Sequence, residues 1–290
     1  MSISETEIGE IVDRALAEDL GKGDVTTEAL IHPQWHGTGI IVAKQDGVLA
    51  GVEIARRVFH RVDACLRTEV LMPDGAKVRP GDGISRIEGS IASILKAERV
   101  ALNFVQRLSG IATLTSLYVE KVKGLPVCIM DTRKTTPGLR LLEKYAVRVG
   151  GGRNHRMTLG DAILIKDNHL TALRRRGLKN IKQIIIEARK NAPSLLGTER
   201  ATIEIEVRTV AEAVEAAEAG ADIIMLDNMS IEDMRQAVRL VGGRALIEAS
   251  GGITLDNVRA VAETGVNFIS VGALTHSAKA LDISLELEVT

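Results

Sequence analysis

Residues 202–228 read TIEIEVRTVAEAVEAAEAGADIIMLDN, and this stretch decides the fold. Two strand-like runs, TIEIEV and DIIMLD, lie on either side of a helix-like run, VAEAVEAAEAG, that ends in a glycine. A strand, a helix and a second strand in succession predict a right-handed β–α–β unit. The two strands of such a unit lie parallel in a sheet that is buried on both faces.

The same alternation begins near Pro126 and continues for six units. The strand-like runs are PVCIMD, DAILIK, TIEIEV, DIIMLD, ALIEAS and NFISVG, and a helix-like run follows each of them. Six units are fewer than the usual eight of a closed barrel. The pattern therefore predicts an α/β fold that is either a doubly wound open sheet or a (β/α) barrel with fewer strands than usual.

The residues before Pro126 have a mixed pattern. Short strands such as TGIIVAK and GVLAG precede an amphipathic helix, VEIARRVFHRV, and two helical segments between residues 90 and 122 follow, with Gly110 as the main interruption. The last residues, DISLELEVT, alternate with period two and predict a surplus strand. We expect an α/β domain at 1–112, joined by the tail 275–290, and a barrel domain at 113–274.

The composition excludes several classes of protein. Lysine plus arginine is 37 and aspartate plus glutamate is 38, so no overall charge draws the chain to nucleic acid or to a membrane. No apolar run approaches the roughly 20 residues of a membrane span, and the acidic N-terminal stretch is unlike a signal peptide. The two cysteines have no metal-site or disulfide spacing. We expect a cytoplasmic protein with no nucleic-acid or membrane partner.

Charged and small residues follow one strand-like run after another. Because the carboxyl ends of parallel strands share one edge of the sheet, these residues are expected to meet in one mouth. The cations indicate that the mouth binds an anion. In chain order the residues are Arg133, Lys134, Lys166, Glu206, Asp227, Ser250, Gly251, Gly252 and Gly272.

Three further patterns refine the chemistry of this mouth. SGGI and VGALT place small residues at the start of helices, where backbone N–H groups bind phosphate, although turn geometry alone also explains glycines there. Glu206 and Asp227 lie on adjacent strands, where paired carboxylates suit Mg²⁺ or a developing positive charge, or form salt bridges with the same cations. The loop GGGRNHR at 150–156 supplies guanidinium groups that suit a planar polyanion.

Each loop cation also has a structural alternative. Arg153 suits a solvated loop position, and His155 suits a loop donor with a structural partner. Lys166 ends an apolar run, AILI, and would be costly there if it were buried without a partner. The signatures of P-loop enzymes, serine hydrolases and zinc proteases are absent from the sequence, and GKGDVT does not complete a dinucleotide-binding fingerprint.

Together these motifs resemble the quinolinate phosphoribosyltransferase family over nearly the whole chain. The resemblance rests on EDLGKGDVTT, AERVALNFVQRLSGIAT, DTRKTTPGLRLLEKYAVRVGGGRNHR, LIKDNH, EIEV, MLDN, EASGGI and VGALTHSAKALDISLEL. It implies an N-terminal α/β sandwich domain and a partly open (β/α) barrel of six or seven parallel strands. It also implies a homodimer, or a higher oligomer built from such dimers, whose active sites are completed across the interface.

The resemblance further implies a reaction and the residues that serve it. Quinolinate and phosphoribosyl pyrophosphate, with Mg²⁺ as cofactor, give nicotinate mononucleotide, pyrophosphate and CO₂ in NAD biosynthesis. Lys166, Glu206 and Asp227 would be catalytic, with Glu206 and Asp227 near the metal. Arg133, His155, Arg156 and Lys166 would bind quinolinate, with Arg99 reaching in from the neighbouring subunit. The residues implied for phosphoribosyl pyrophosphate are Lys134, Glu206 and Asp227, and those for its 5′-phosphate are Ser250, Gly251, Gly252, Gly272 and His276.

Two alternatives stay open from the sequence. A lyase that uses Lys166 as a Schiff base would also place a lysine at a barrel strand end, but would favour a desolvated amine. A paralogue associated with molybdenum transport shares TRK and GGG…HR and lacks the lysine of IKDNH, so Lys166 favours the transferase.

Overall fold

The computed structural model describes residues 4–178, 180–196 and 201–289. The chain divides into two compact units. The first contains the residues up to 116, residues 135–151 and the residues from 273, and the second contains residues 117–134 and 152–272. The segment 135–151 thus belongs to the first unit, whereas the sequence pattern had grouped it with the barrel.

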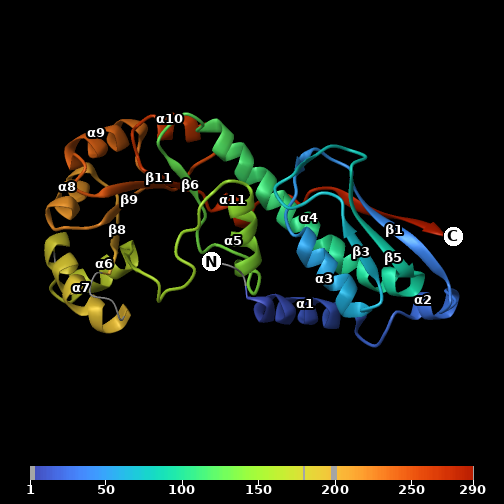
Figure 1. Ribbon diagram of the computed structural model, residues 1–290. Helices are drawn as coiled ribbons and strands as arrows, with labels where there is room; N and C mark the ends of the chain where they lie inside the picture. Colours follow the sequence, from blue (N-terminus) through green and yellow to red (C-terminus); the bar gives the residue numbers. More distant parts are fainter. Residues whose placement is uncertain (1–3, 179, 197–200, 290) are drawn as a thin grey trace. The chain divides into compact units, whose positions relative to one another are not determined.

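The first unit is built around an antiparallel sheet of four strands in the order β12, β1, β5, β3 (Figure 1). These strands are Ile283–Val289, His36–Ala43, Gly83–Ser90 and Arg67–Val70. The surplus strand predicted in the tail is confirmed, and it pairs with β1. A two-stranded ribbon, β2 (Gly47–Val48) with β4 (Lys77–Val78), completes the strands of this unit that the structure describes.

The helices of the first unit include α1 (Glu5–Leu20), α2 (Val25–Leu30), α3 (Val52–Val62), α5 (Arg140–Val149) and α11 (Ala273–His276). The predicted amphipathic helix is α3, which buries Val52, Ile54, Ala55, Val58 and Phe59. These positions recur at helical spacing, so one face of the helix is apolar and packs into the core.

A single helix, α4 (Ile91–Lys121), replaces the two segments expected between residues 90 and 122. It runs through Gly110 without a break. A side chain at Gly110 would place its Cβ 2.0 Å from the carbonyl oxygen of Lys279. The glycine therefore permits close backbone approach rather than ending the helix.

The second unit contains a parallel sheet of six strands in the order β6, β11, β10, β9, β8, β7. The strands in chain order are β6 (Cys128–Met130), β7 (Ile163–Ile165), β8 (Ile203–Val207), β9 (Ile223–Asp227), β10 (Leu246–Ser250) and β11 (Phe268–Ser270). The prediction of an α/β fold with six parallel strands is confirmed. Strands β6 and β7 form the two edges of the sheet, and β6 makes one further bridge to Arg153.

The helices between these strands are α6 (Asp167–Arg175), α7 (Ile181–Leu196), α8 (Val210–Glu218), α9 (Ile231–Val241) and α10 (Val258–Ala262). Side-chain caps fix where two of them begin: Thr209 accepts from the N–H of Glu212, and Ser230 from that of Asp233. Both caps lie just after a strand, so they turn the chain at the carboxyl edge of the sheet. Across the described residues, no helix is both long and apolar enough for a membrane crossing.

Candidate active site

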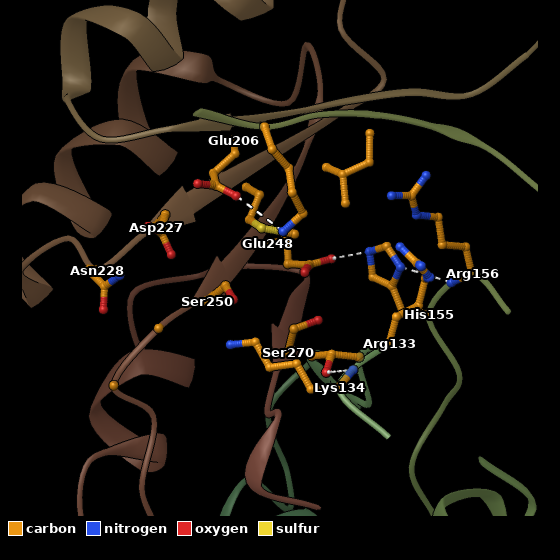
Figure 2. A pocket seen from close by; sticks show the side chains of 16 residues that line it. Arg133, Lys134, His155, Arg156, Glu206, Asp227, Asn228, Glu248, Ser250 and Ser270 are labelled. Carbon is orange, nitrogen blue, oxygen red and sulfur yellow. Dashed lines mark hydrogen bonds and ion pairs between the residues drawn. The ribbon is translucent and has the colours of Figure 1, made fainter. Parts of the chain in front are cut away.

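The carboxyl ends of the six parallel strands surround a cavity of about 490 Å³ (Figure 2). Every residue that lines it belongs to the second unit. Most of the residues predicted from the strand ends are among them, because parallel strands end at a common edge. The lining residues are Thr132, Arg133, Lys134, His155, Arg156, Leu164, Lys166, Glu206, Met225, Asp227, Asn228, Glu248, Ser250, Gly251, Gly252 and Ser270.

Two guanidinium groups in this cavity have unused hydrogen-bonding capacity. In the described part of the chain, the Nε atoms of Arg133 and Arg156 are buried and have no hydrogen-bond partner. Arg156 is fixed on one side, since its Nη1 donates to the carbonyl of Ala162 at 2.9 Å. Burial and the positive charge of Arg133 lower the pKa of Arg156. Two adjacent, partly desolvated guanidiniums with free N–H groups favour an anionic ligand.

The acidic pair lies on the neighbouring strands β8 and β9. Glu206 is level with Met225, so Asp227 stands two residues further along the adjacent strand. The Nζ of Lys166 lies 3.4 Å from Glu206 Oε2, and the Nε of Arg208 lies 3.9 Å from Asp227 Oδ2. The salt bridge that the sequence left open is thus present at Glu206. Glu206 is 8% exposed, and the side chain of Lys166 is 46% exposed.

The exposure of Lys166 bears on its chemistry. It caps the start of α6 and ends the apolar strand β7, yet its amine reaches solvent and a carboxylate. A Schiff-base lysine needs an uncharged amine, which desolvation favours. Lys166 is instead half exposed and lies beside the carboxylate of Glu206, which is not the desolvated position that a Schiff-base lysine favours.

Glycines after β10 permit a tight junction with the end of β9. Gly251 has φ +88°, and a Cβ there would lie 2.4 Å from Asn228 Oδ1. Asn228 itself has φ +53°, and its N–H donates to the carbonyl of Ser250 at 2.9 Å. The sequence predicted small residues here, and the close contact with Asn228 is one reason for Gly251 that the sequence did not reveal.

The loop that carries Arg156 is held by buried acids. Asp131 is fully buried and accepts from the N–H of His155 at 2.9 Å and from Asn154 Nδ2 at 2.5 Å. The Nδ1 of His155 accepts from the N–H of Arg156 at 2.8 Å, and its Nε2 lies 3.1 Å from Glu204 Oε2. Both ring nitrogens therefore face protein groups. This matches the structural alternative for His155 rather than a free donor to the ligand.

The sequence reasoning missed two acids at this site, Glu204 and Glu248. Both are buried inside strands, with 3% and 1% exposure. Their signal was an acid within an apolar strand run, in TIEIEV and ALIEAS. Glu204 also stands two residues before Glu206, so both side chains project from the same face of β8.

Three predicted residues are not among those that line the cavity. Arg99 is exposed on α4 and His276 is exposed on α11, and both belong to the first unit. Gly272 follows β11 in the second unit, two residues after Ser270, which does line the cavity. Arg153 is exposed, in agreement with its solvated alternative.

The donor set of Glu206 and Asp227 fits Mg²⁺. Both offer hard carboxylate oxygens at the same edge of the sheet, and Mg²⁺ is commonly held by one or two carboxylates together with substrate phosphates.

Comparison with known proteins assigns the chain over almost its full length. Residues 24–109 match the N-terminal domain of quinolinate phosphoribosyl transferase, and residues 111–286 match its C-terminal domain. A nicotinate-nucleotide pyrophosphorylase [carboxylating] of Arabidopsis thaliana is 44% identical over 96% of this chain and 82% of its own length. A probable nicotinate-nucleotide pyrophosphorylase of Bacillus subtilis is 42% identical over 98% and 94%.

A solved structure shows the same fold. NadC from Streptococcus pyogenes superposes with a TM-score of 0.92 at 43% identity, covering 100% of this chain and 99% of that one. With both domains matched in order and the strand-end residues gathered in one cavity, the chain belongs to the quinolinate phosphoribosyl transferase family.

Proposed function

We propose that this protein transfers the phosphoribosyl group of phosphoribosyl pyrophosphate to quinolinate. The products are nicotinate mononucleotide, pyrophosphate and CO₂, in the biosynthesis of NAD. One observation carries the proposal: Arg133 and Arg156, whose Nε atoms have no hydrogen-bond partner in the described part of the chain, share a cavity with the acids Glu206 and Asp227. The two arginines suit a dicarboxylate substrate, and the two acids suit a reaction that develops positive charge.

Quinolinate binding falls to the cations. Arg133 and Arg156 present planar forks to carboxylates, and Lys166 adds a point charge to the same cavity beside Glu206. His155 supports this arrangement indirectly, because its ring fixes the backbone of Arg156. We therefore assign His155 to holding the loop rather than to a direct hydrogen bond with the substrate.

The transfer step develops positive charge on the ribose carbon. As the bond to pyrophosphate breaks, that carbon becomes oxocarbenium-like, and the carboxylates of Glu206 and Asp227 stabilise it. The side chain of Lys134 neutralises charge on the departing pyrophosphate. The ring nitrogen of quinolinate then attacks the ribose carbon.

Loss of CO₂ follows from the new bond. Once the ring nitrogen is quaternary, the carbon next to it can hold an electron pair as an ylide, so its carboxylate leaves as CO₂. The positive charge of Lys166 favours binding of the dianion before this step. The carboxylate that remains on the ring stays bound to the guanidinium groups of Arg133 and Arg156.

The phosphates have their own assignments. Mg²⁺, held by Glu206 and Asp227 with the substrate phosphates, would supply positive charge that offsets the charge of pyrophosphate. For the 5′-phosphate we propose Ser250, Gly251, Gly252, Gly272 and His276, through backbone N–H groups and the imidazole.

We also propose a homodimer in which Arg99 completes the neighbouring subunit's site. The exposure of Arg99 on α4 is consistent with this role. Arg99→Ala and Arg133→Ala should each be nearly inactive, yet a mixture should regain activity, since a hybrid dimer has one site with both defects and one with neither. Mixed variants that exchange subunits and stay inactive would contradict the shared site.

Two free cysteines, Cys65 and Cys128, suit a reducing compartment, and we propose the cytoplasm.

The direct test is product formation by the purified protein. With quinolinate, phosphoribosyl pyrophosphate and Mg²⁺, nicotinate mononucleotide and CO₂ should appear in equal amounts. Nicotinate in place of quinolinate should give little product, because it leaves one set of cations unpaired. An active, folded protein that accepts nicotinate and ignores quinolinate would overturn the assignment.

A further inference from the structure

Glu248 is a buried carboxyl group in the cavity wall that the steps above leave unused. It lies on β10, is 1% exposed and lines the cavity. Its Oε2 lies 3.7 Å from His155 Nε2, whereas Glu204 Oε2 lies closer to the same nitrogen, at 3.1 Å. Its Oε1 has no hydrogen-bond partner among the described residues. The imidazole is thus paired chiefly with Glu204, and Glu248 keeps one oxygen unengaged.

The surroundings of Glu248 favour its protonated form. Burial, and then the negative charge of Glu204, raise the pKa of Glu248 to about 7, against the opposing effects of His155, of the neighbouring Ser270 hydroxyl and of Lys166. Glu206 and Asp227, on the two preceding strands, add further negative charge to the cavity, and Arg133, Lys134 and Arg156 add positive charge. Two neighbouring carboxyls in unlike environments are the usual source of an acid that acts near neutral pH.

The position of Glu248 matches one atom of the substrate. Glu206, Met225 and Glu248 stand in one row across β8, β9 and β10. In Figure 2, Glu248 lies between Glu206 and Asp227 on one side and His155 and Arg156 on the other. In quinolinate, the carbon that loses CO₂ lies between the nitrogen that joins the ribose and the carbon that keeps its carboxylate. Ribose at the acids and the retained carboxylate at the arginines bring that carbon toward Glu248.

We propose that Glu248 is the acid that protonates this ring carbon after CO₂ has left, an inference that rests on the proposed function. The bond from the ring carbon to the departing carboxylate breaks, and its electron pair stays on the carbon. That pair takes the proton from the Glu248 carboxyl group. Glu248 is left as a carboxylate and regains a proton from solvent after the product leaves.

Lys166 is less suited to this step. Its ammonium group is 3.4 Å from Glu206, and its side chain is 46% exposed, so its proton is held by an ion pair and by water. The carboxyl of Glu248 is shielded from water, carries no ion pair with a lysine or arginine among the described residues, and has only the neutral hydroxyl of Ser270 beside it as a possible acceptor. It therefore donates to the base that forms in the cavity.

Glu248→Gln tests the proposal because glutamine keeps the shape of the side chain and has no acidic proton. Wild-type kcat should fall as pH rises above about 7. The variant should lose about 100-fold in kcat and lose this decline, and its KM should fall along with kcat, because the steps up to pyrophosphate release are unchanged. In a single turnover it should still release pyrophosphate at the wild-type rate. Glu204→Gln should keep the decline but move it to lower pH, because one negative neighbour of Glu248 is gone.

Three results would overturn the proposal: wild-type kcat in folded Glu248→Gln, the same decline above pH 7 in that variant, or loss of the pyrophosphate burst. If Glu248→Gln does not fold, Glu248→Asp decides, since it keeps an acid on a shorter side chain. It should show lower kcat with the decline retained, and a flat profile would contradict the role. Failure of the proposed function is seen separately, as wild-type protein that makes no nicotinate mononucleotide.

Discussion

Each unit of the chain contains a cluster of buried charge, and the two clusters differ in how fully their polar atoms are paired. In the first unit, fully buried Glu143 accepts from Arg107 at 2.8 Å, and from both the N–H and the hydroxyl of Thr136. In the second unit, Arg133 Nε, Arg156 Nε and an oxygen of Glu248 are buried and have no hydrogen-bond partner among the residues that the structure describes.

This difference separates a stabilising role from a binding role. A buried polar atom without a hydrogen bond costs about 1–3 kcal/mol, so native proteins rarely keep several in one place. Their concentration in the cavity is explained by a ligand that supplies the missing partners. The Glu143 cluster needs no ligand, because the protein satisfies it. Substitutions in the first cluster should therefore reduce stability, and those in the second should reduce activity.

The largest effect is expected for Lys166→Ala. The amine faces the cavity and binds the substrate dianion, so its loss should lower kcat/KM by about 10³-fold. Its side chain is 46% exposed and its ion pair is long, so the free energy of unfolding should change by less than about 1 kcal/mol. Steady-state kinetics and urea unfolding measure the two quantities. Lys123→Ala is the control, because it removes an exposed pair with Glu120 of 3.2 Å.

The comparison breaks if Lys166→Ala behaves like a core substitution. Suppose the variant unfolds much more easily while its folded fraction keeps normal specific activity. Lys166 would then have a stabilising role and not a binding role.

The second effect concerns Glu143→Ala. Removal of this carboxylate takes away the anionic partner of Arg107, which keeps only neutral acceptors among the described residues, and it removes the acceptor of the Thr136 N–H. Breaking a buried ion pair from one side is expected to lower the free energy of unfolding by about 3 kcal/mol. Glu263→Ala is the control, since its pair with Arg259 is about half exposed on both sides and should cost under about 1 kcal/mol. Equal unfolding midpoints for the two variants would contradict the stabilising role.

The sequence predicted much of the cavity and little of its support. Arg133, Lys166, Glu206 and Asp227 were found because each ends a strand-like run, and parallel strands end at one edge. The role of Gly110 in α4 depends on Lys279, which lies far along the chain. No periodicity along the sequence reports such a contact.

The sequence did not identify the buried acids Glu204 and Glu248, for a related reason. Within an apolar run, Glu204 and Glu248 look like ordinary strand residues. Only the tertiary structure shows that Glu248 lines the cavity and that Glu204 pairs with His155. The pairing of both His155 nitrogens likewise depends on side chains from distant segments. Local pattern locates strand ends, and tertiary contacts decide which polar atoms remain unpaired.

The third effect is a pH dependence of stability. The folded pKa of Glu248, about 7, is raised above the ordinary value of 4.5, so its contribution is fully present below pH 4.5 and is lost as pH rises to 7. Glu248→Gln has no such dependence. Between pH 5 and pH 8 the wild-type free energy of unfolding should therefore fall relative to this variant, by on the order of 2 kcal/mol. If wild type and Glu248→Gln differ by the same free energy of unfolding at pH 5 and at pH 8, Glu248 is ionised in the folded protein at both pH values.

The smallest effect sharpens the comparison with the two tyrosines, one in each unit. The hydroxyl of Tyr145 donates to Asp74 at 2.5 Å, and burial and this carboxylate raise its pKa. Asp74 also accepts from the N–H groups of Gly51 and Val52, so Tyr145→Phe leaves it partly satisfied. The free energy of unfolding should fall by about 1 kcal/mol, close to the contribution of a single hydrogen bond.

Tyr118→Phe is the matched control, because the Tyr118 hydroxyl donates to a neutral carbonyl, that of Ile253, at 3.4 Å. It should change the unfolding midpoint less than Tyr145→Phe. The reverse order would mean that the short hydrogen bond to Asp74 adds no stability. It would also contradict the idea that internally paired polar groups stabilise the first unit.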